Sequence, residues 1–264
     1  MIPSALEHIQ EIAGCSGQLA VFLDYDGTLT PIVSWPDQAV LADSTRVILR
    51  QLASKVPVAI LSGRELEDVR KRIAIDGIVY AGSHGFDIAG PRGLRTQEAT
   101  EFLPALDAAE KELRKRLAGI SGALVERKHF SIAAHYRNVN ETDFPNVEHA
   151  VSEVARRHQE LRKMEGKKVY ELLPDINWDK GKAVLWLLET VGSEHAKVRP
   201  IYIGDDRTDE DAFRALGGRG IGILVSEEPK STAANYSLRD PAEVEHFLRE
   251  LVTRSALPTV TSPS

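Results

Sequence analysis

Short runs of consecutive apolar residues recur along the chain, and stretches with helical spacing separate many of them. Runs of this kind indicate strands that are covered on both faces, as in a parallel sheet. The runs lie at residues 19–23, 56–61, 78–81, 201–203 and 220–225, and helices are predicted at 43–54, 64–73, 179–191 and 207–216. This alternation predicts right-handed crossovers and a doubly wound α/β sheet.

The middle of the chain breaks the alternation. Apolar residues at helical spacing cover 104–119 and 145–163, and residues 124–139 between them predict paired strands with one polar face. We therefore predict a smaller α+β cap domain at 103–174, inserted into a core domain formed by residues 1–102 and 175–264.

Composition and charge narrow the class of protein. The chain has 264 residues, of which 42% are hydrophobic and 27% charged, as in ordinary globular domains. No apolar stretch approaches the roughly 18–20 residues that span a bilayer, and no signal peptide is evident, so we expect a cytoplasmic protein without a membrane partner. The net charge of −6 argues against a nucleic-acid partner.

The two ends and the cysteine add smaller points. Ser4 and Glu7 have the spacing of a capping box, which predicts a short helix near the N-terminus. Cys15 is the only cysteine, so an intrachain disulfide and a cysteine zinc cluster are excluded. The segment from about Ser255 has no apolar periodicity and is expected to fray.

Polar clusters follow four of the predicted strands. DYDGT comes after 19–23, SGR after 56–61, GSHG after 78–81, and GDDRTDED after 201–203. Open α/β sheets bind ligands at the carboxyl ends of their strands. We therefore expect the four clusters to meet in one crevice.

The first cluster contains a pair of carboxylates. Asp24 and Asp26 are two residues apart, so they project to the same side of an extended backbone. They could hold a magnesium ion, and one could attack phosphorus while the other handles the leaving-group proton. The alternative is that Asp26-Gly27 is only a turn.

Ser62 and Lys180 are candidates for binding a phosphate. The Ser62 hydroxyl and the amides of the following helix could form a phosphate cradle, or Ser62 could be an ordinary N-cap. Lys180 opposes the macrodipole of its helix, and Gly181 weakens that helix. Both features suit an ammonium group that reaches a phosphate, although a solvated surface lysine is the alternative.

Three aspartates form the last cluster. Asp205, Asp206 and Asp209 follow a predicted buried strand, where like charges repel unless a divalent cation neutralises them. Acidic residues also favour a helix N-terminus, so each could be structural.

The order of these clusters resembles the four motifs of the haloacid dehalogenase-like superfamily. That resemblance implies a Rossmann-like core with a C2-type cap. It implies that Asp24 is the nucleophile that forms an aspartyl-phosphate and that Asp26 is the general acid and then base. Ser62 and Lys180 would stabilise the transferring phosphoryl group.

The same resemblance implies a Mg²⁺ cofactor. Its ligands would be Asp24, Asp205 and the backbone carbonyl of Asp26. Asp206 or Asp209 would act through a coordinated water.

Within this superfamily the chain resembles the trehalose-6-phosphate phosphatases, through LDYDGTLTPI, LSGR, GSHG, a Glu-x-Lys pair with HYR downstream, and WDKGKAV. The resemblance implies residues that bind the sugar or lie beside it, namely Glu126, Lys128, Glu171, His84, Gly85 and Arg64. From spacing alone, the charged cap residues could equally be an exposed sheet face. One departure is Leu173, where that family often has an arginine.

The implied reaction is hydrolysis of trehalose 6-phosphate to trehalose and phosphate, the final step of trehalose biosynthesis. We expect any trehalose-6-phosphate synthase to be a separate chain. The cap is expected to close by hinging near 101–104 and 172–176. Alternatives are a phosphatase for sucrose phosphate, mannosylglycerate phosphate or a hexose phosphate, a phosphomutase, and a non-catalytic module that binds trehalose phosphate.

Overall fold

The computed structural model describes residues 2–14, 18–33, 35–166, 168–192 and 198–254. Cys15 and the tail from Ser255 lie outside these residues. The chain divides into two compact units, one of residues 1–96 with 178–264 and one of residues 97–177. The second unit begins six residues before the expected insertion (97 against 103) and ends three residues after it (177 against 174).

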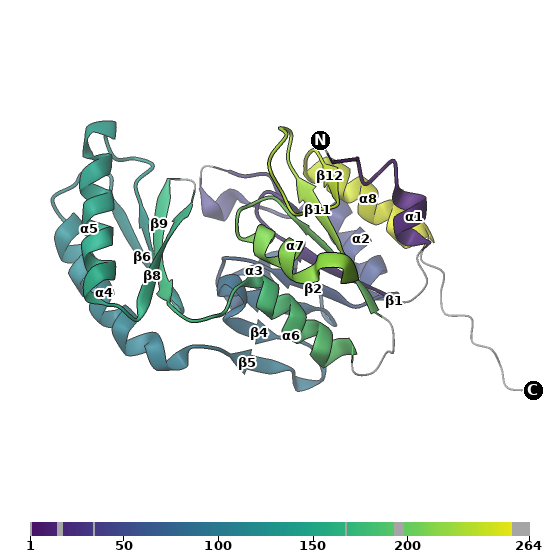
Figure 1. Cartoon of the computed structure of the whole chain (residues 1–264), viewed down its shortest axis with the longest axis horizontal. Coiled ribbons are helices and arrows are strands. Elements are labelled where there is room, and N and C mark those ends of the chain that lie inside the picture. The colour runs from purple at the N-terminus through teal and green to yellow at the C-terminus, as the bar shows by residue number, and fades with distance from the viewer. Residues whose placement is uncertain (1, 15–17, 34, 167, 193–197, 255–264) are drawn as a thin grey trace, which may run out of the picture. The chain divides into compact units, whose positions relative to one another are not determined.

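Helices and strands alternate through most of the chain (Figure 1). The helices are α1 (Ile9–Ala13), α2 (Asp43–Ala53), α3 (Leu66–Ile73), α4 (Leu103–Leu117), α5 (Phe144–Arg157), α6 (Lys180–Gly192), α7 (Asp209–Leu216) and α8 (Pro241–Arg254). The strands are β1 (Gln18–Asp24), β2 (Val58–Leu61), β3 (Val79–Gly82), β4 (Asp87–Ala89), β5 (Arg95–Gln97), β6 (Leu124–Lys128), β7 (Ser131–His135), β8 (Leu161–Gly166), β9 (Val169–Pro174), β10 (Val198–Gly204), β11 (Ile221–Val225) and β12 (Tyr236–Leu238).

The first unit is built on an eight-stranded sheet with the order β12-β11-β10-β1-β2-β3-β4-β5. The strands from β12 to β3 are parallel, and β4 is antiparallel to β3. The chain winds from β1 to β2 and β3 in one direction, and from β10 to β12 on the other side of β1. The doubly wound parallel fold is thus confirmed, and its topological switch point lies beside β1, where such sheets bind ligands.

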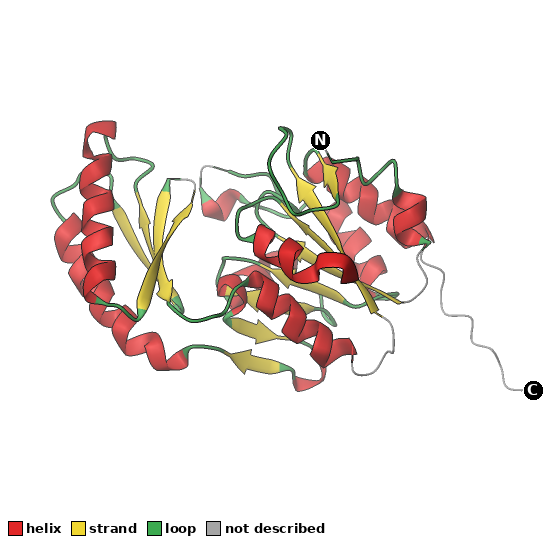
Figure 2. Ribbon diagram, in the orientation of Figure 1, coloured by secondary structure: helices red, strands yellow, loops and turns green. Residues whose placement is uncertain are grey.

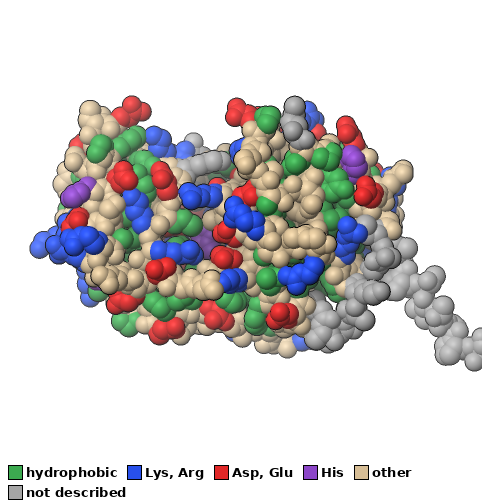
Figure 3. Space-filling model, viewed as in Figure 1, with side chains coloured by type: hydrophobic (Ala, Val, Ile, Leu, Met, Phe, Trp, Pro, Cys, Tyr) green, Lys and Arg blue, Asp and Glu red, His purple; other side chains and the backbone are tan. Residues whose placement is uncertain are grey.

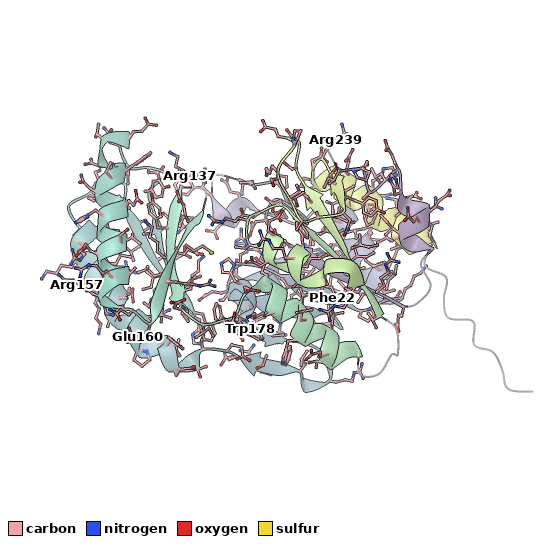
Figure 4. All side chains as sticks on the ribbon, in the orientation of Figure 1. Phe22, Arg137, Arg157, Glu160, Trp178 and Arg239 are labelled. Atoms are coloured by element: carbon pink, nitrogen blue, oxygen red, sulfur yellow. The ribbon has the colours of Figure 1, made fainter. Side chains whose placement is uncertain are left out.

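Helices cover both faces of this sheet (Figure 2), and an apolar layer packs on each face. Leu23 of β1 packs in the layer of α1, α2, α3 and α8, whereas Phe22 packs in the layer of α6 and α7. Figure 4 labels Phe22 on this strand. Because alternate residues of a strand face opposite sides, two covered faces require the continuous apolar runs of the sequence.

The second unit is an antiparallel sheet with the order β6-β7-β9-β8, and α4 and α5 lie on one side of it (Figure 2). Its core joins Leu106 and Leu113 of α4 to Val151 of α5 and Ile132 of β7. Since one face of the sheet is covered by helices, its strands alternate between apolar and polar residues.

Two expectations about local structure are wrong. The helix predicted at 145–163 ends at Arg157, because Leu161, which continues its apolar spacing, begins β8 and pairs with Pro174 of β9. The Ser4 capping box is absent, because Ser4 forms a β-bridge with Ser237 and α1 starts only at Ile9. In both places the backbone N–H and carbonyl groups that a helix would bond internally are instead paired with a neighbouring strand.

None of the described helices is both long enough and apolar enough to cross a membrane.

Candidate active site

Strand register brings the predicted clusters to one edge of the larger sheet. Asp24, the last residue of β1, lies opposite Leu61 of β2, and Leu23 lies opposite Ile203 of β10. Ser62 follows Leu61 directly, and Asp205 follows Gly204 at the end of β10. Parallel strands end at the same edge, so the clusters that follow them meet there.

A buried lysine joins two of these carboxylates. Lys180 has 3% of its side chain exposed, and its Nζ donates 2.7 Å hydrogen bonds to Asp24 Oδ1 and to Asp209 Oδ1. Burial alone would lower the pKa of Lys180, but the charges of Asp209 and Asp24 outweigh burial and raise the pKa, so the ammonium form persists. The alternative of a solvated surface lysine is therefore wrong.

Asp205 lies against the loop that follows β1. Gly27 has a φ of +86°, and a Cβ atom there would come within 2.2 Å of Asp205 Oδ2. Only glycine allows both this backbone conformation and this approach. The Asp26-Gly27 pair does lie in a turn, in which the Tyr25 carbonyl accepts the Leu29 and Thr30 N–H groups at 3.0 Å, and the turn also shapes the carboxylate cluster.

Among the described residues, three carboxylates come close enough to share a metal ion. Asp24, Asp205 and Asp209 each offer one oxygen, and these oxygens lie within 4.8 Å of one another. Burial, together with Asp209 and Asp205, raises the pKa of Asp24, while Lys180 opposes that rise. When all three carboxylates are ionised, one ammonium leaves a net charge of −2, which a divalent cation would balance, and oxygen donors are those that Mg²⁺ prefers.

Both carboxylate oxygens of Asp209 nevertheless accept hydrogen bonds from other groups of the protein. Besides Lys180, its Oδ1 accepts a 2.7 Å bond from the Tyr202 hydroxyl. Its Oδ2 accepts the backbone N–H groups of Asp205 and Asp206 at 3.0 and 2.9 Å. Four hydrogen bonds from within the protein therefore occupy the two oxygens of Asp209.

The structure keeps two of the predicted side chains out of this carboxylate group. Asp206 is exposed, and its Oδ1 accepts the Arg207 N–H at 2.6 Å. The Asp26 carboxylate is held by Arg64, whose Nε and Nη2 donate to its two oxygens at 2.6 and 2.7 Å. This paired geometry is the strong, directional form of an ion pair.

Arg64 is the centre of a larger network of charges. Its Nη1 donates to Asp68 at 3.0 Å, and Arg72 Nε donates to both oxygens of Asp68 at 2.9 Å. Burial alone would raise the pKa of Asp68, but the hydrogen bonds from Arg72 and Arg64 outweigh it and lower the pKa. Sequence analysis did not select Asp68 or Arg72, although their four-residue spacing on a predicted helix was a usable signal.

The loops after β2 and β3 are hydrogen-bonded to each other. Ser62 is buried, its carbonyl accepts the His84 N–H at 2.9 Å, and its Oγ accepts the Arg64 N–H at 3.1 Å. The N-cap of α3 is Glu65, so the alternative that Ser62 is a routine N-cap is wrong.

The chain re-enters the first unit beside the loop after β3. Trp178, labelled in Figure 4 just before α6, donates from its Nε1 to the Gly85 carbonyl at 2.9 Å. A Cβ atom at Gly85 would lie 2.5 Å from the Ala183 Cβ, so this loop packs directly on α6. His84 and Gly85 are thus held close to both Ser62 and the start of α6.

The charged residues predicted in the second unit share one face of its sheet. Glu126 lies opposite Ala133, which lies opposite Glu171, so the two carboxylates flank a small side chain in one row across three strands. Lys128 Nζ donates to Glu171 Oε1 at 2.7 Å. The residues that sequence analysis grouped are therefore adjacent, on the face opposite α4 and α5.

His135 lies on this face too; sequence analysis noted it within the HYR motif but did not select it as a site residue. Its Nε2 lies 2.8 Å from Glu126 Oε2. This hydrogen bond is the main cause that lowers the pKa of Glu126, with burial opposing it and Lys128 adding to it. At Leu173, where the sequence departs from the resemblance, Arg162 lies directly opposite on β8.

The surface carries mixed charges. On the face shown in Figure 3, basic and acidic side chains are interspersed. This distribution gives no support to a nucleic-acid interface on that face, which would gather basic residues.

Comparisons with known proteins agree with the motifs. A family model described as trehalose-phosphatase matches residues 22–242. A probable trehalose-phosphate phosphatase D of Arabidopsis thaliana is 46% identical over 265 residues, which cover 95% of this chain and 72% of that protein.

Solved structures agree on the fold. The C-terminal domain of the C. albicans trehalose-6-phosphate phosphatase superposes with a TM-score of 0.83 at 23% identity, covering 96% of this chain and 98% of that one. A haloacid dehalogenase-like hydrolase of Bacteroides thetaiotaomicron superposes with a TM-score of 0.64 at 15% identity, covering 89% and 99%.

Proposed function

The chain belongs to the trehalose-phosphatase family, and we propose that it hydrolyses trehalose 6-phosphate to trehalose and inorganic phosphate. The observation that carries this proposal is the buried network of Asp24, Lys180 and Asp209 beside Asp205 at the switch point of the sheet. Phosphoryl transfer depends on positioning and charge neutralisation, and this network supplies a carboxylate nucleophile next to a fixed positive charge.

In the first step, an Asp24 carboxylate oxygen attacks phosphorus and the bond from phosphorus to the sugar oxygen breaks. Asp26 donates a proton to that leaving oxygen, which departs as the trehalose hydroxyl. In the second step, Asp26 takes a proton from water, and the water oxygen attacks the phosphorus of the aspartyl-phosphate. The bond from phosphorus to Asp24 breaks, which releases phosphate and restores the carboxylate.

Ser62 and Lys180 would stabilise the negative charge on the phosphoryl oxygens. Lys180 suits this role because its ammonium group is buried, and electrostatic stabilisation is strongest where water is excluded. Ser62 lies at the same edge of the sheet, directly after the residue that pairs with Asp24.

Mg²⁺ is the cofactor that the acidic group fits. We propose that Asp24, Asp205 and the backbone carbonyl of Asp26 hold it, with Asp206 acting through water. When bound, the ion would neutralise the cluster and the phosphate oxygens. Asp209 is the less suitable ligand because four hydrogen bonds occupy its oxygens.

We propose that the sugar is recognised by Glu126, Lys128 and Glu171, with His84 and Gly85 as further contacts. Charged groups make strong, directional hydrogen bonds to hydroxyl groups. The small side chain of Ala133 lies between the two carboxylates in the row. Residues 103–174 would act as the specificity cap of a core formed by residues 1–102 and 175–264, in the cytoplasm.

The test is phosphate release from trehalose 6-phosphate, sucrose phosphate, glucose phosphate and a small aryl phosphate, each with and without Mg²⁺. We expect a metal-dependent preference for trehalose 6-phosphate. Asp24→Asn should lower turnover of every ester by at least about a thousand-fold, because it removes the nucleophile.

Glu126→Gln separates substrate choice from chemistry. It should lower kcat/KM for trehalose 6-phosphate by about ten- to a hundred-fold, the cost of one charged hydrogen bond, and leave turnover of the aryl ester unchanged. Glu165→Gln, an exposed glutamate on β8, is the matched control. Preference for another sugar phosphate would show that the proposed substrate is wrong. Binding of trehalose 6-phosphate without turnover of any ester would favour the alternative of a non-catalytic binding module.

A further inference from the structure

Tyr202 is a fully buried residue of β10 that the chemistry above does not use. Its ring packs edge-on against Phe213 of α7, with centroids 5.7 Å apart and an interplanar angle of 81°. A phenylalanine would fill the same space between the sheet and its helices. The hydroxyl group therefore needs a separate explanation, because a buried polar group is costly unless it is hydrogen-bonded.

The hydroxyl donates a 2.7 Å hydrogen bond to the carboxylate of Asp209. Burial, followed by the charge of Asp209, raises the pKa of Tyr202, so the phenol keeps its proton and remains a donor. The bond runs to Oδ1, the same oxygen that receives Lys180. Tyr202 and Lys180 thus hold one carboxylate oxygen from two directions.

Asp209 in turn fixes two parts of the candidate active site. Its Oδ1 receives the Lys180 ammonium, which also reaches Asp24, and its Oδ2 receives the N–H groups at the start of the acidic loop, including that of Asp205. A Cβ atom at Gly204 would lie 2.3 Å from the Asp209 carboxyl carbon, so the carboxylate is seated against the end of β10. Any rotation of Asp209 would move the ammonium or the acidic loop.

We propose that Tyr202 is a positioning residue for phosphoryl transfer: its hydroxyl locks the orientation of Asp209, and through it the position of Lys180 beside Asp24. This inference rests on the proposed function, because it assigns Lys180 to the transferring phosphoryl group. Positioning is the main catalytic resource in this class of reaction, and a small displacement of a charged group costs rate rather than binding.

The test is Tyr202→Phe, which keeps the ring and removes only the hydroxyl. We expect kcat to fall about ten-fold, the loss associated with one hydrogen bond to a charged group, with KM changed by less than about two-fold. The effect should be equal for trehalose 6-phosphate and for the small aryl phosphate. A sugar-binding defect would change only the first.

Tyr80→Phe is the matched control. Tyr80 is also buried in the sheet, on β3, and its hydroxyl accepts the Ile75 N–H and donates to the Ile75 carbonyl. It should lose comparable stability in urea denaturation and keep its kcat. Equal kcat losses in the two variants, or no loss in Tyr202→Phe, would overturn the inference.

Phe213→Leu tests whether a loss of kcat in Tyr202→Phe comes from a general packing or folding defect rather than from the missing hydroxyl. It loosens the packing of the ring and retains the hydroxyl, so we expect near-normal kcat. A loss as large as that of Tyr202→Phe would assign the effect to packing and overturn the inference.

The aryl ester also separates this inference from the proposed substrate. If the wild-type protein hydrolysed the aryl ester but not trehalose 6-phosphate, the proposed substrate would be wrong. The kcat of Tyr202→Phe could still be compared with that of the wild type on the aryl ester. Absence of turnover of every ester would overturn both.

Discussion

Arg64 contacts Asp26 through both of its carboxylate oxygens, and this geometry assigns the arginine a different role from the one that the sequence suggested. Resemblance grouped Arg64 with the substrate-binding residues. Its guanidinium instead lies between Asp26 and Asp68, with its central carbon 5.4 Å from the centre of the Tyr25 ring. A side chain held in this way is better placed to orient Asp26 than to reach for a sugar.

Arg64→Lys tests this assignment, because an ammonium group cannot reproduce the two-point contact with a carboxylate. We expect kcat for trehalose 6-phosphate to fall about ten-fold while KM stays within about two-fold, as for a change that acts on the reacting groups alone. Arg72→Lys is the matched control, because the Nε of Arg72 donates to Asp68 rather than to Asp26. A raised KM with an unchanged kcat would instead indicate that Arg64 binds the substrate.

The reactive residues were predictable and many of their partners were not. Asp24, Ser62 and Asp205 each follow a strand, and strand ends can be located from the sequence because apolar runs are continuous. Tyr202 reads as one more member of such a run. His135 is nine residues from Glu126, and only the register of β6 with β7 brings their side chains together.

Gly181 is an unfavourable residue near the start of α6, as the sequence indicated, but the reason inferred from the sequence was incomplete. The sequence suggested that this glycine weakens the start of α6 to suit Lys180. In the structure, α6 packs on α7 so closely that a Cβ atom at Gly181 would lie 2.4 Å from the Asp211 carbonyl oxygen and 2.9 Å from the Ala215 Cβ. The glycine is required by the contact between the two helices.

Gly181→Ala is therefore expected to destabilise the protein. Helix propensity alone would stabilise it by up to about 1 kcal/mol, whereas overpacking against a backbone carbonyl costs about 1–3 kcal/mol. Urea denaturation should show a net loss of about 1–2 kcal/mol in the free energy of unfolding. Gly218→Ala, where a Cβ would meet nothing within 4 Å, should show no such loss. A stabilised Gly181→Ala would mean that helix propensity decides at this position.

The end of α5 is a place where the sequence pattern predicts too long a helix. Apolar residues at Val147, Val151 and Val154 predict a helix correctly, and Leu161 lies seven residues further on, again at helical spacing. The chain nevertheless leaves the helix at His158, because Leu161 pairs with Pro174 in the sheet. Spacing within one segment cannot reveal a pairing partner that is thirteen residues away, so the helix was extended too far.

At the scale of the whole molecule, two chain crossings join the compact units, and the structure narrows the range of residues at which the second crossing can bend. The expected hinge at 172–176 overlaps β9, where Leu172 pairs with Ile132 and Pro174 pairs with Leu161. The Asp175 N–H also donates to the Glu160 carbonyl at 2.7 Å. A hydrogen-bonded backbone does not absorb large dihedral changes, so bending should be confined to residues 176–177 on this side.

We predict that substrate draws the two units into a more compact arrangement, because the phosphate is proposed to bind to one unit and the sugar to the other. The Asp24→Asn variant allows this to be measured, since it should bind trehalose 6-phosphate without turning it over. Small-angle X-ray scattering should show a smaller radius of gyration with trehalose 6-phosphate than without it. Inorganic phosphate, which lacks the sugar, should produce little change. Identical scattering curves with and without saturating trehalose 6-phosphate would contradict closure, and the sugar contacts would then have to form without movement of the second unit.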